Sequence, residues 1–252
     1  MQVFEEHSFK DFLGNPTQEV DHAWGIERRF SVAKENIENF ASIIKNTLYR
    51  HHSSFDVVDE ITNLGFPLSA DALRTRNSGL PKDLKTRMGH LGEVIGAEFA
   101  RAYLNYQTTM IFPKRLNPNP DQSMKGVDVL GFREENLPAE ILLGEVKSYT
   151  SLDKRAISEA YSNLKSLSNN KKLPVFFHFA KEYSTIQKNY DQRNNIDRHM
   201  ADNTPRNCFL LSVTQTNPRD PFSDIPQNSN IQLMAVHIQL ENIRSFLSVL
   251  FQ

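Results

Sequence analysis

The chain has 252 residues, of which 39% are hydrophobic and 23% charged, the ordinary balance of a globular protein that buries a core. The formal net charge of −1 excludes a protein that coats nucleic acid by bulk electrostatics, and no apolar run is long enough to cross a membrane. A secretion signal is not visible at the N-terminus, and the single cysteine, Cys208, excludes an internal disulfide framework. We therefore expect a cytoplasmic protein in which Cys208 is a small core residue.

The first third of the chain carries weak periodic signals. Apolar residues at helical spacing predict one helix over 32–49, and the segment 65–81 is rich in Gly, Pro, Ser and Asn, which is typical of a connection. We interpret residues 1–80 as an N-terminal helical or irregular extension of a domain that spans 81–252. The lead-in to this extension is acidic, whereas residues 71–115 carry a basic excess. That excess fits either a confined phosphate-binding groove or an ordinary solvated face.

A long helix is predicted next, over 83–106, because its apolar residues fall on one stripe. Gly89, Gly92 and Gly96 lie on a neighbouring stripe. Each glycine inside a helix costs roughly 1 kcal/mol relative to alanine. Their presence predicts that the helix packs closely against another backbone.

After this helix the apolar period changes from that of a helix toward two, which is typical of strands. The order helix, three strands, helix and strand predicts an α/β core with a mixed sheet. The expected elements are strands at 108–112, 127–132 and 140–148, a helix at 153–167 and a strand at 174–179, followed by strands at 209–214 and 231–240 and a helix at 241–251.

Two acid-x-lysine tripeptides occur, and a chain with 30 acidic residues should hold about two by chance. Their contexts differ. Asp83 and Lys85 open a helix, where residues two apart do not share a face. Glu145 and Lys147 end an apolar strand, where residues two apart point the same way. Only the second pair is therefore a candidate for shared chemistry.

Hairpin geometry adds a third residue to this pair. If strands 127–132 and 140–148 form a hairpin, its centre falls in the polar loop 133–138, and Asp128 lies opposite Glu145. Two adjacent carboxylates repel each other, and a divalent cation such as Mg²⁺ or Mn²⁺ would relieve that repulsion. Lys147 could then orient an attacking water or neutralise charge on a phosphate. The alternative is a structural ion pair at a sheet edge.

Asp128, Glu145 and Lys147, in this order of elements, resemble the PD-(D/E)xK nuclease superfamily over residues 83–179. One departure is Val127, where the motif has proline. The resemblance implies a restriction-endonuclease-like core, a nuclease domain over 81–252 and a Mg²⁺-dependent DNA endonuclease activity. It also implies a further metal-site carboxylate from the first helix. For that role we favour Glu93 over its competitor Glu98, because Glu93 adjoins the glycine stripe.

More narrowly, the chain resembles the DUF1837-type nucleases, the nuclease subunit of the Hachiman anti-phage defence system. The matching pieces are 91–93, 125–131 and 143–148. This resemblance implies DNA as the target and a helicase or ATPase subunit as partner, and it fits the absence of a phosphate-binding loop motif in this chain. Two alternatives stay open: a stand-alone restriction or repair endonuclease, and a non-catalytic nucleic-acid-binding subunit.

Overall fold

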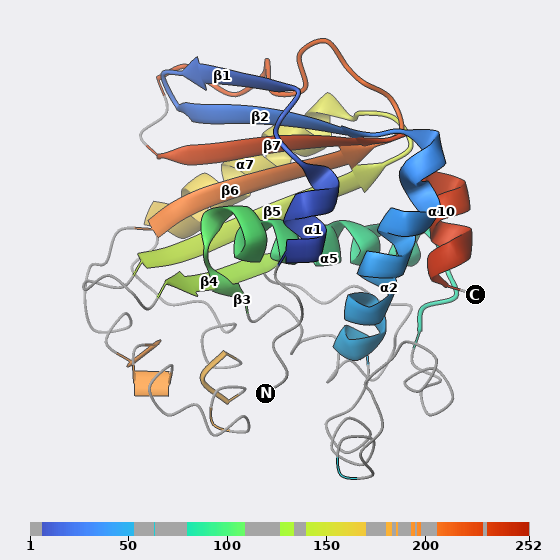
Figure 1. The fold of residues 1–252 in the computed structure, drawn as a ribbon. Coiled ribbons are helices and arrows are strands. Elements are labelled where there is room, and N and C mark those ends of the chain that lie inside the picture. Colours follow the sequence, from blue (N-terminus) through green and yellow to red (C-terminus); the bar gives the residue numbers. More distant parts are fainter. Residues whose placement is uncertain are drawn as a thin grey trace.

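The computed structural model describes residues 7–52, 63, 80–108, 127–133, 140–169, 180–182, 185, 193–194, 196–197, 206–228 and 231–251. The predicted strand at 174–179 and most of the one at 108–112 lie outside these residues. Within them, strands and helices form a mixed α/β structure around one sheet (Figure 1). The predicted α/β class with a mixed sheet is therefore confirmed.

The sheet has seven strands in the described residues, in the order β1-β2-β7-β6-β5-β4-β3. The strands are β1 (Gln18–His22), β2 (Gly25–Val32), β3 (Gln107–Thr108), β4 (Val129–Arg133), β5 (Glu140–Tyr149), β6 (Arg206–Thr214) and β7 (Leu233–Leu240). The four central strands, β2, β7, β6 and β5, are parallel to one another. Antiparallel pairs complete both edges, with β1 on β2 at one side and β4 and β3 beside β5 at the other.

Two of these strands come from the segment that the sequence analysis described as helical or irregular. Residues 18–32 form β1 and β2, and β2 pairs in parallel with β7 from the opposite end of the chain. The helix predicted from Val32 accordingly starts later, because Val32 ends β2. The strands were missed because their polar and apolar residues alternate only weakly, and the partner that buries them is about 200 residues away in the sequence. The division into two domains at residue 80 stays a prediction.

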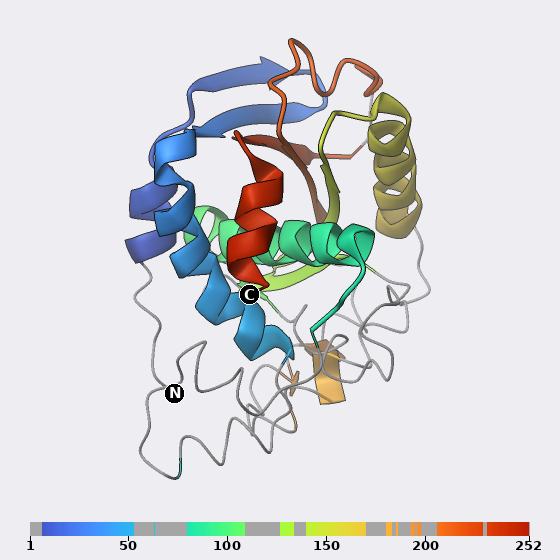
Figure 2. The same cartoon turned by 90° about the vertical axis from the view of Figure 1, so that its right-hand side faces the viewer.

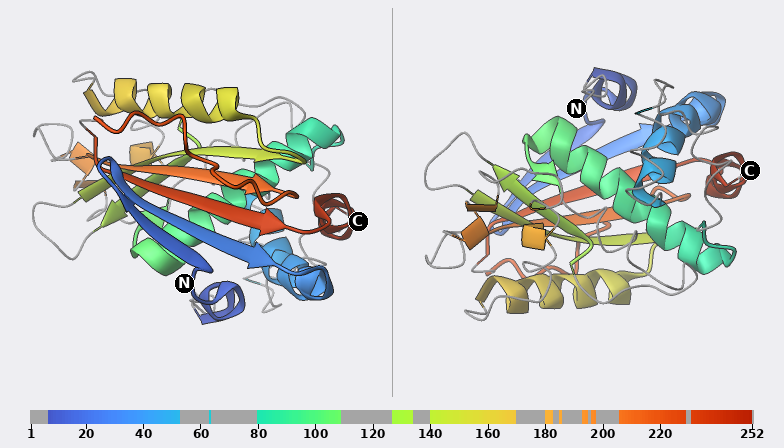
Figure 3. Two further views of the ribbon diagram at one scale, coloured as in Figure 1. Left: turned by 90° about the horizontal axis from the view of Figure 1, so that it is seen from above. Right: turned by 90° about the horizontal axis from the view of Figure 1, so that it is seen from below.

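Helices cover both faces of the sheet (Figures 2 and 3). They are α1 (His7–Leu13), α2 (Ile37–His52) after the short 3-10 turn η1 (Lys34–Asn36), α5 (Leu84–Leu104), α7 (Lys154–Asn169) and α10 (Ile243–Leu250). One face packs against α1, α2, α5 and α10, and the other against α7 and the segment between β6 and β7. None of the described helices is long and apolar enough to span a bilayer.

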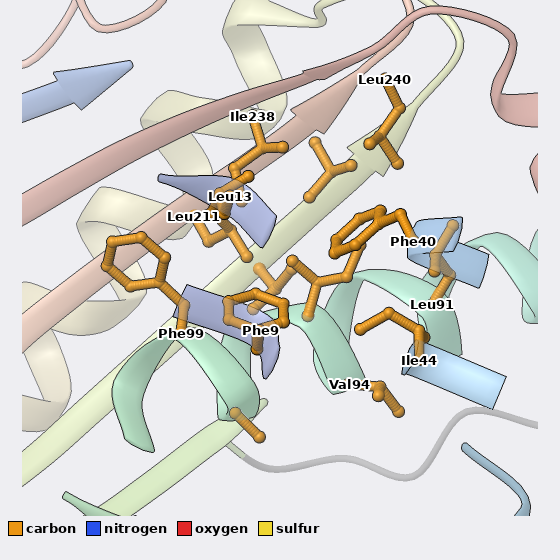
Figure 4. Packing of buried hydrophobic residues seen from close by; sticks show 14 of the residues in the cluster. Phe9, Leu13, Phe40, Ile44, Leu91, Val94, Phe99, Leu211, Ile238 and Leu240 are labelled. Carbon is orange, nitrogen blue, oxygen red and sulfur yellow. The ribbon is translucent and has the colours of Figure 1, made fainter. Parts of the chain in front are cut away.

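The larger core lies on the α5 side of the sheet, where side chains from distant parts of the chain interlock (Figure 4). Phe9 of α1 and Phe40 of α2 pack with their ring centroids 5.7 Å apart, and Phe99 of α5 stacks on Phe209 of β6. On the opposite face Cys208 is buried as predicted, and Trp24 is a buried core residue stacked on His22. The α1, β2 and α2 segments, together with Trp24 before β2, thus contribute to the same two cores as the rest of the described chain.

Helix α5 packs closely on β5 through two of its glycines. A methyl group at Gly92 would lie 2.8 Å from Ser148 Cβ, and one at Gly96 would lie 2.8 Å from Val146 Cγ2. Gly89 meets nothing within 4 Å. The close packing predicted from the glycine stripe is therefore confirmed for two of the three glycines.

The different amounts of space around Gly89 and Gly96 predict that an alanine substitution has opposite effects at the two positions. Gly89→Ala should raise the free energy of unfolding by about 0.5–1 kcal/mol, because alanine is the better helix former and has space here. Gly96→Ala should lower it by about 1–3 kcal/mol, because the new methyl group would push against Val146 and Val129. Urea unfolding of the two variants measures both changes. Equal effects would contradict the close approach of α5 to β5.

Candidate active site

The site lies where β4 begins beside β5. Val129 pairs with Gly144, so Asp128, one residue before β4, lies beside Glu145 on the neighbouring strand. The Asp128 carboxylate accepts a hydrogen bond from the backbone N–H of Val146, with the nitrogen 2.8 Å from Oδ2. The hairpin register predicted from the sequence is thereby confirmed, and this hydrogen bond fixes Asp128 at the edge of β5.

Glu145 and Lys147 share one face of β5, as the strand period predicts. The Lys147 ammonium donates to Glu145 Oε2 over 3.2 Å, whereas Val146 points the other way and packs under α5. The Glu145 side chain is only 7% exposed and that of Lys147 is 22% exposed. Glu145 is therefore buried, and only Lys147 reaches the partly exposed side of the site.

The two glutamates proposed for the helix have different surroundings. Glu93 follows Gly92, the point where α5 touches β5, and its charge acts on the carboxyl groups of both Asp128 and Glu145. Glu98 instead accepts a hydrogen bond from Arg101, with Nη2 2.6 Å from Oε2. Of the two glutamates, Glu93 is thus the one whose charge acts on Asp128 and Glu145.

Burial and crowding of like charges change the pKa values of this cluster. Burial, followed by the charges of Glu93 and Glu145, raises the pKa of Asp128 to about 8. Burial also raises the pKa of Glu145, although the Lys147 ammonium opposes this effect. For Lys147, burial alone would lower the pKa, but the Glu145 and Asp128 carboxylates outweigh it and raise the pKa. Two carboxyl groups, those of Asp128 and Glu145, thus act on one ammonium, and the charge of Glu93 acts on both of these carboxyl groups.

The donor chemistry of this cluster fits a hard divalent cation. Asp128 uses one carboxylate oxygen for Val146 and Glu145 uses one for Lys147, so each has a second oxygen for a metal. The described residues do not form a closed group of three or more His, Cys, Asp or Glu ligands. Mg²⁺ does not need such a cage, because it keeps several waters and typically binds through one or two carboxylates.

Tyr149 is a neighbour of the site that the sequence analysis did not single out. It ends β5 two residues after Lys147, and its pKa is raised by burial against the opposing charge of Lys147. The alternation that links Glu145 to Lys147 extends to Tyr149 and would have identified it. His90 of α5, in contrast, is a buried residue, 4% exposed.

The raised pKa of Asp128 predicts how stability depends on pH in the absence of metal. The folded protein holds a proton on Asp128 that the unfolded chain releases near pH 4, so this group's contribution to stability falls as pH rises from about 4 to 8. Asp128→Asn should therefore stabilise the metal-free protein by about 0.5–2 kcal/mol at pH 8.5, with little difference at pH 4. Urea unfolding in chelator at both pH values measures this change. Glu159→Gln, at an exposed position on α7, is the control, and an equal gain there would contradict the assignment.

Comparison with known proteins shows the family of this chain. The HamA family model matches residues 2–249. This chain belongs to the HamA family. A relative described as "Hachiman protein HamA", from Bacillus cereus, is 40% identical over 85 residues, which cover 34% of this chain. The aligned stretch spans only 30% of that relative's length, so the family model carries the assignment over the whole chain.

Proposed function

We propose that this HamA family chain is a metal-dependent nuclease that hydrolyses DNA phosphodiester bonds. The observation that carries the proposal is the hydrogen bond from Val146 to Asp128, which holds Asp128 beside Glu145 and Lys147. A carboxylate pair with a lysine at this spacing is the pattern of the PD-(D/E)xK nucleases. A purely structural ion pair would need one carboxylate per lysine, whereas here two carboxyl groups act on Lys147 and a third, that of Glu93, acts on both of them.

Each residue has a distinct role in this proposal. Asp128 and Glu145 would hold Mg²⁺ or Mn²⁺, with Glu93 as a further carboxylate of the metal site. The metal would lower the pKa of a bound water and withdraw charge from the phosphate. The Lys147 ammonium stays protonated beside the carboxylates and neutralises negative charge that develops on the phosphate oxygens. The Val146 N–H keeps Asp128 in position while the phosphodiester is hydrolysed.

A cleavage assay tests the activity directly. The purified chain is incubated with supercoiled, linear and single-stranded DNA, with Mg²⁺, with Mn²⁺ and with chelator. An RNA of the same sequence serves as the comparison substrate. We expect cleavage of DNA that depends on either cation. Full activity in chelator, or no cleavage of any substrate with either cation, would overturn the proposal.

The role of Glu93 gives a ranked prediction. Glu93→Ala should lower the cleavage rate by about 10- to 100-fold, because it removes a carboxylate that interacts with both Asp128 and Glu145. Glu98→Ala should change the rate by less than about twofold, because Glu98 is paired with Arg101 on the same helix. Single-turnover cleavage of one labelled duplex compares the two variants. The reverse ranking would move the helix role to Glu98.

We also infer that the chain is the effector of an anti-phage defence system that works with a helicase or ATPase partner. The name of the Bacillus cereus relative supports a place in the Hachiman system, and it favours this reading over a stand-alone restriction or repair endonuclease. The described N-terminal residues offer an edge strand, β1, whose Glu19 and Asp21 are exposed. Affinity purification from native cells tests the partnership, and recovery of the chain without any ATPase would contradict it.

A further inference from the structure

A row of polar side chains extends from the proposed active site across the sheet. Lys147 of β5 pairs in register with Ser212 of β6, Ser212 with His237 of β7, and His237 with Arg29 of β2. Register partners on adjacent strands point to the same face, so these four side chains share the face that packs against α7. Figure 3 shows the four strands side by side, with α7 lying along the β5 side of the sheet. We call this set the polar row.

On two of its four strands, β6 and β7, the polar row follows an apolar stretch of the same face. On β6 and β7 the preceding residues of that face, Leu210 and Ala235, are hydrophobic, whereas on β5 and β2 they are buried glutamates. Ser212 and His237 are both fully buried, at 0% exposed. The Ser212 hydroxyl makes no hydrogen bond within the described residues, and the His237 ring has only a long contact with the Thr216 backbone. Buried polar groups without partners cost free energy, so their place in this core calls for a partner that they acquire in another state of the site.

The order of the side chains suggests that partner. An ammonium has three N–H donors, a serine hydroxyl can accept one hydrogen bond and donate another, and a neutral imidazole has one acceptor nitrogen. Burial and the nearby Arg29 charge lower the pKa of His237 to about 4 although the Thr216 backbone opposes this effect, so the ring is neutral at physiological pH. Lys147, Ser212 and His237 can therefore form a chain in which each group donates to the next. Neighbouring strands lie about 4.8 Å apart, which suits side-chain hydrogen bonds between register partners.

In the present structure Lys147 donates to Glu145 instead. When Glu145 binds a cation, part of its negative charge is neutralised and its attraction for the Lys147 ammonium weakens. We propose that Ser212, oriented by His237, is then the positioning residue that holds the Lys147 ammonium in its working orientation. This proposal deepens the proposed nuclease function and rests on it.

The first test needs neither metal nor activity. Glu145→Gln removes the charge that holds Lys147, which imitates its engagement by a cation. In the metal-free Glu145→Gln protein, we expect a slowly exchanging lysine ammonium signal in ¹H–¹⁵N NMR spectra, assigned to Lys147 by its loss in Lys147→Arg. The signal should be lost when Ser212→Ala is added. Persistence of the signal without the Ser212 hydroxyl, or its absence from the Glu145→Gln protein, would overturn the proposal.

The second test uses cleavage kinetics. Ser212→Ala should lower kcat by about 10- to 100-fold and leave KM for DNA within about twofold, because the substitution disturbs Lys147 without touching the substrate. Its thermal midpoint should stay the same or rise, since it removes a buried hydroxyl that has no partner. Ser212→Thr, which keeps the hydroxyl, should retain most of the wild-type kcat. The double variant Ser212→Ala/His237→Leu should lose less kcat, relative to wild type, than the product of the losses in the two single variants.

Thr214→Val is the matched control, because Thr214 is the next residue of β6 on the same face. Its hydroxyl already donates to the Thr216 carbonyl, with the two oxygens 2.6 Å apart. This variant should therefore lower the thermal midpoint and keep kcat, the opposite of Ser212→Ala. If wild-type protein cleaves DNA and Ser212→Ala has the same kcat, the positioning role is wrong and the nuclease function stands. If wild-type protein does not cleave, the proposed function fails, and the NMR test still decides whether Ser212 holds Lys147.

Discussion

Lys147→Ala and Glu145→Ala should each reduce DNA cleavage by about 100- to 1,000-fold while the protein stays folded. The Lys147 ammonium interacts with the carboxyl groups of Glu145 and Asp128, and Glu145 is both its hydrogen-bond partner and a proposed metal ligand. Removing either side chain disturbs the charge balance of a partly buried site, so the free energy of unfolding should change by only about 1–2 kcal/mol. Single-turnover cleavage, with circular dichroism to check folding, measures both effects.

The other acid-x-lysine sequence supplies the control for this experiment. Lys85, paired in sequence with Asp83, is exposed at the start of α5. Lys85→Ala removes the same side chain from the same kind of tripeptide, and kcat should stay within about twofold of wild type. Cleavage by Lys147→Ala at the wild-type rate, or an equal loss of cleavage in Lys85→Ala, would contradict the catalytic role of Lys147.

Gly25→Ala should be the most destabilising single-methyl substitution in the N-terminal part of the sheet. Gly25 has φ of +141°, and a methyl group there would lie 1.9 Å from the Leu233 carbonyl oxygen. Since that oxygen belongs to the backbone of β7, it cannot move without breaking the parallel pairing of β2 with β7. We expect a loss of about 3 kcal/mol or more, which lowers the thermal midpoint by about 6–12 °C.

Gly14→Ala separates backbone strain from collision. Gly14 also has a positive φ, +66°, but a methyl group there meets nothing within 4 Å. Its cost should be only about 1–2 kcal/mol. Thermal unfolding of both variants, with hydrogen exchange of β7 amides, shows whether β1 and β2 unfold together with the rest of the sheet. If Gly25→Ala left the protection of the β7 amides against hydrogen exchange unchanged, the residues before 80 would be a separate folding unit.

The sequence by itself determined the local part of the site. The alternation in 140–148 puts Glu145 and Lys147 on one face, because successive residues of a strand point to opposite sides. The hairpin register that sets Asp128 beside Glu145 also follows from the sequence, since a short connection allows few pairings of two adjacent strands. The glycine stripe likewise predicted that α5 lies close to another backbone.

Only the tertiary structure decided which distant segments become neighbours. Parallel pairing of β5 with β6, β6 with β7, and β7 with β2 sets Ser212, His237 and Arg29 in line with Lys147, and no local period encodes these partners. The sequence favoured Glu93 over Glu98 through the glycine stripe, but the action of Glu93 on Asp128 and the raised pKa of Asp128 depend on where α5 crosses the sheet. The physical reason is that strand period and hairpin register follow from neighbouring residues along the chain. Parallel partners and buried charges are instead selected by packing of the whole sheet between its helices.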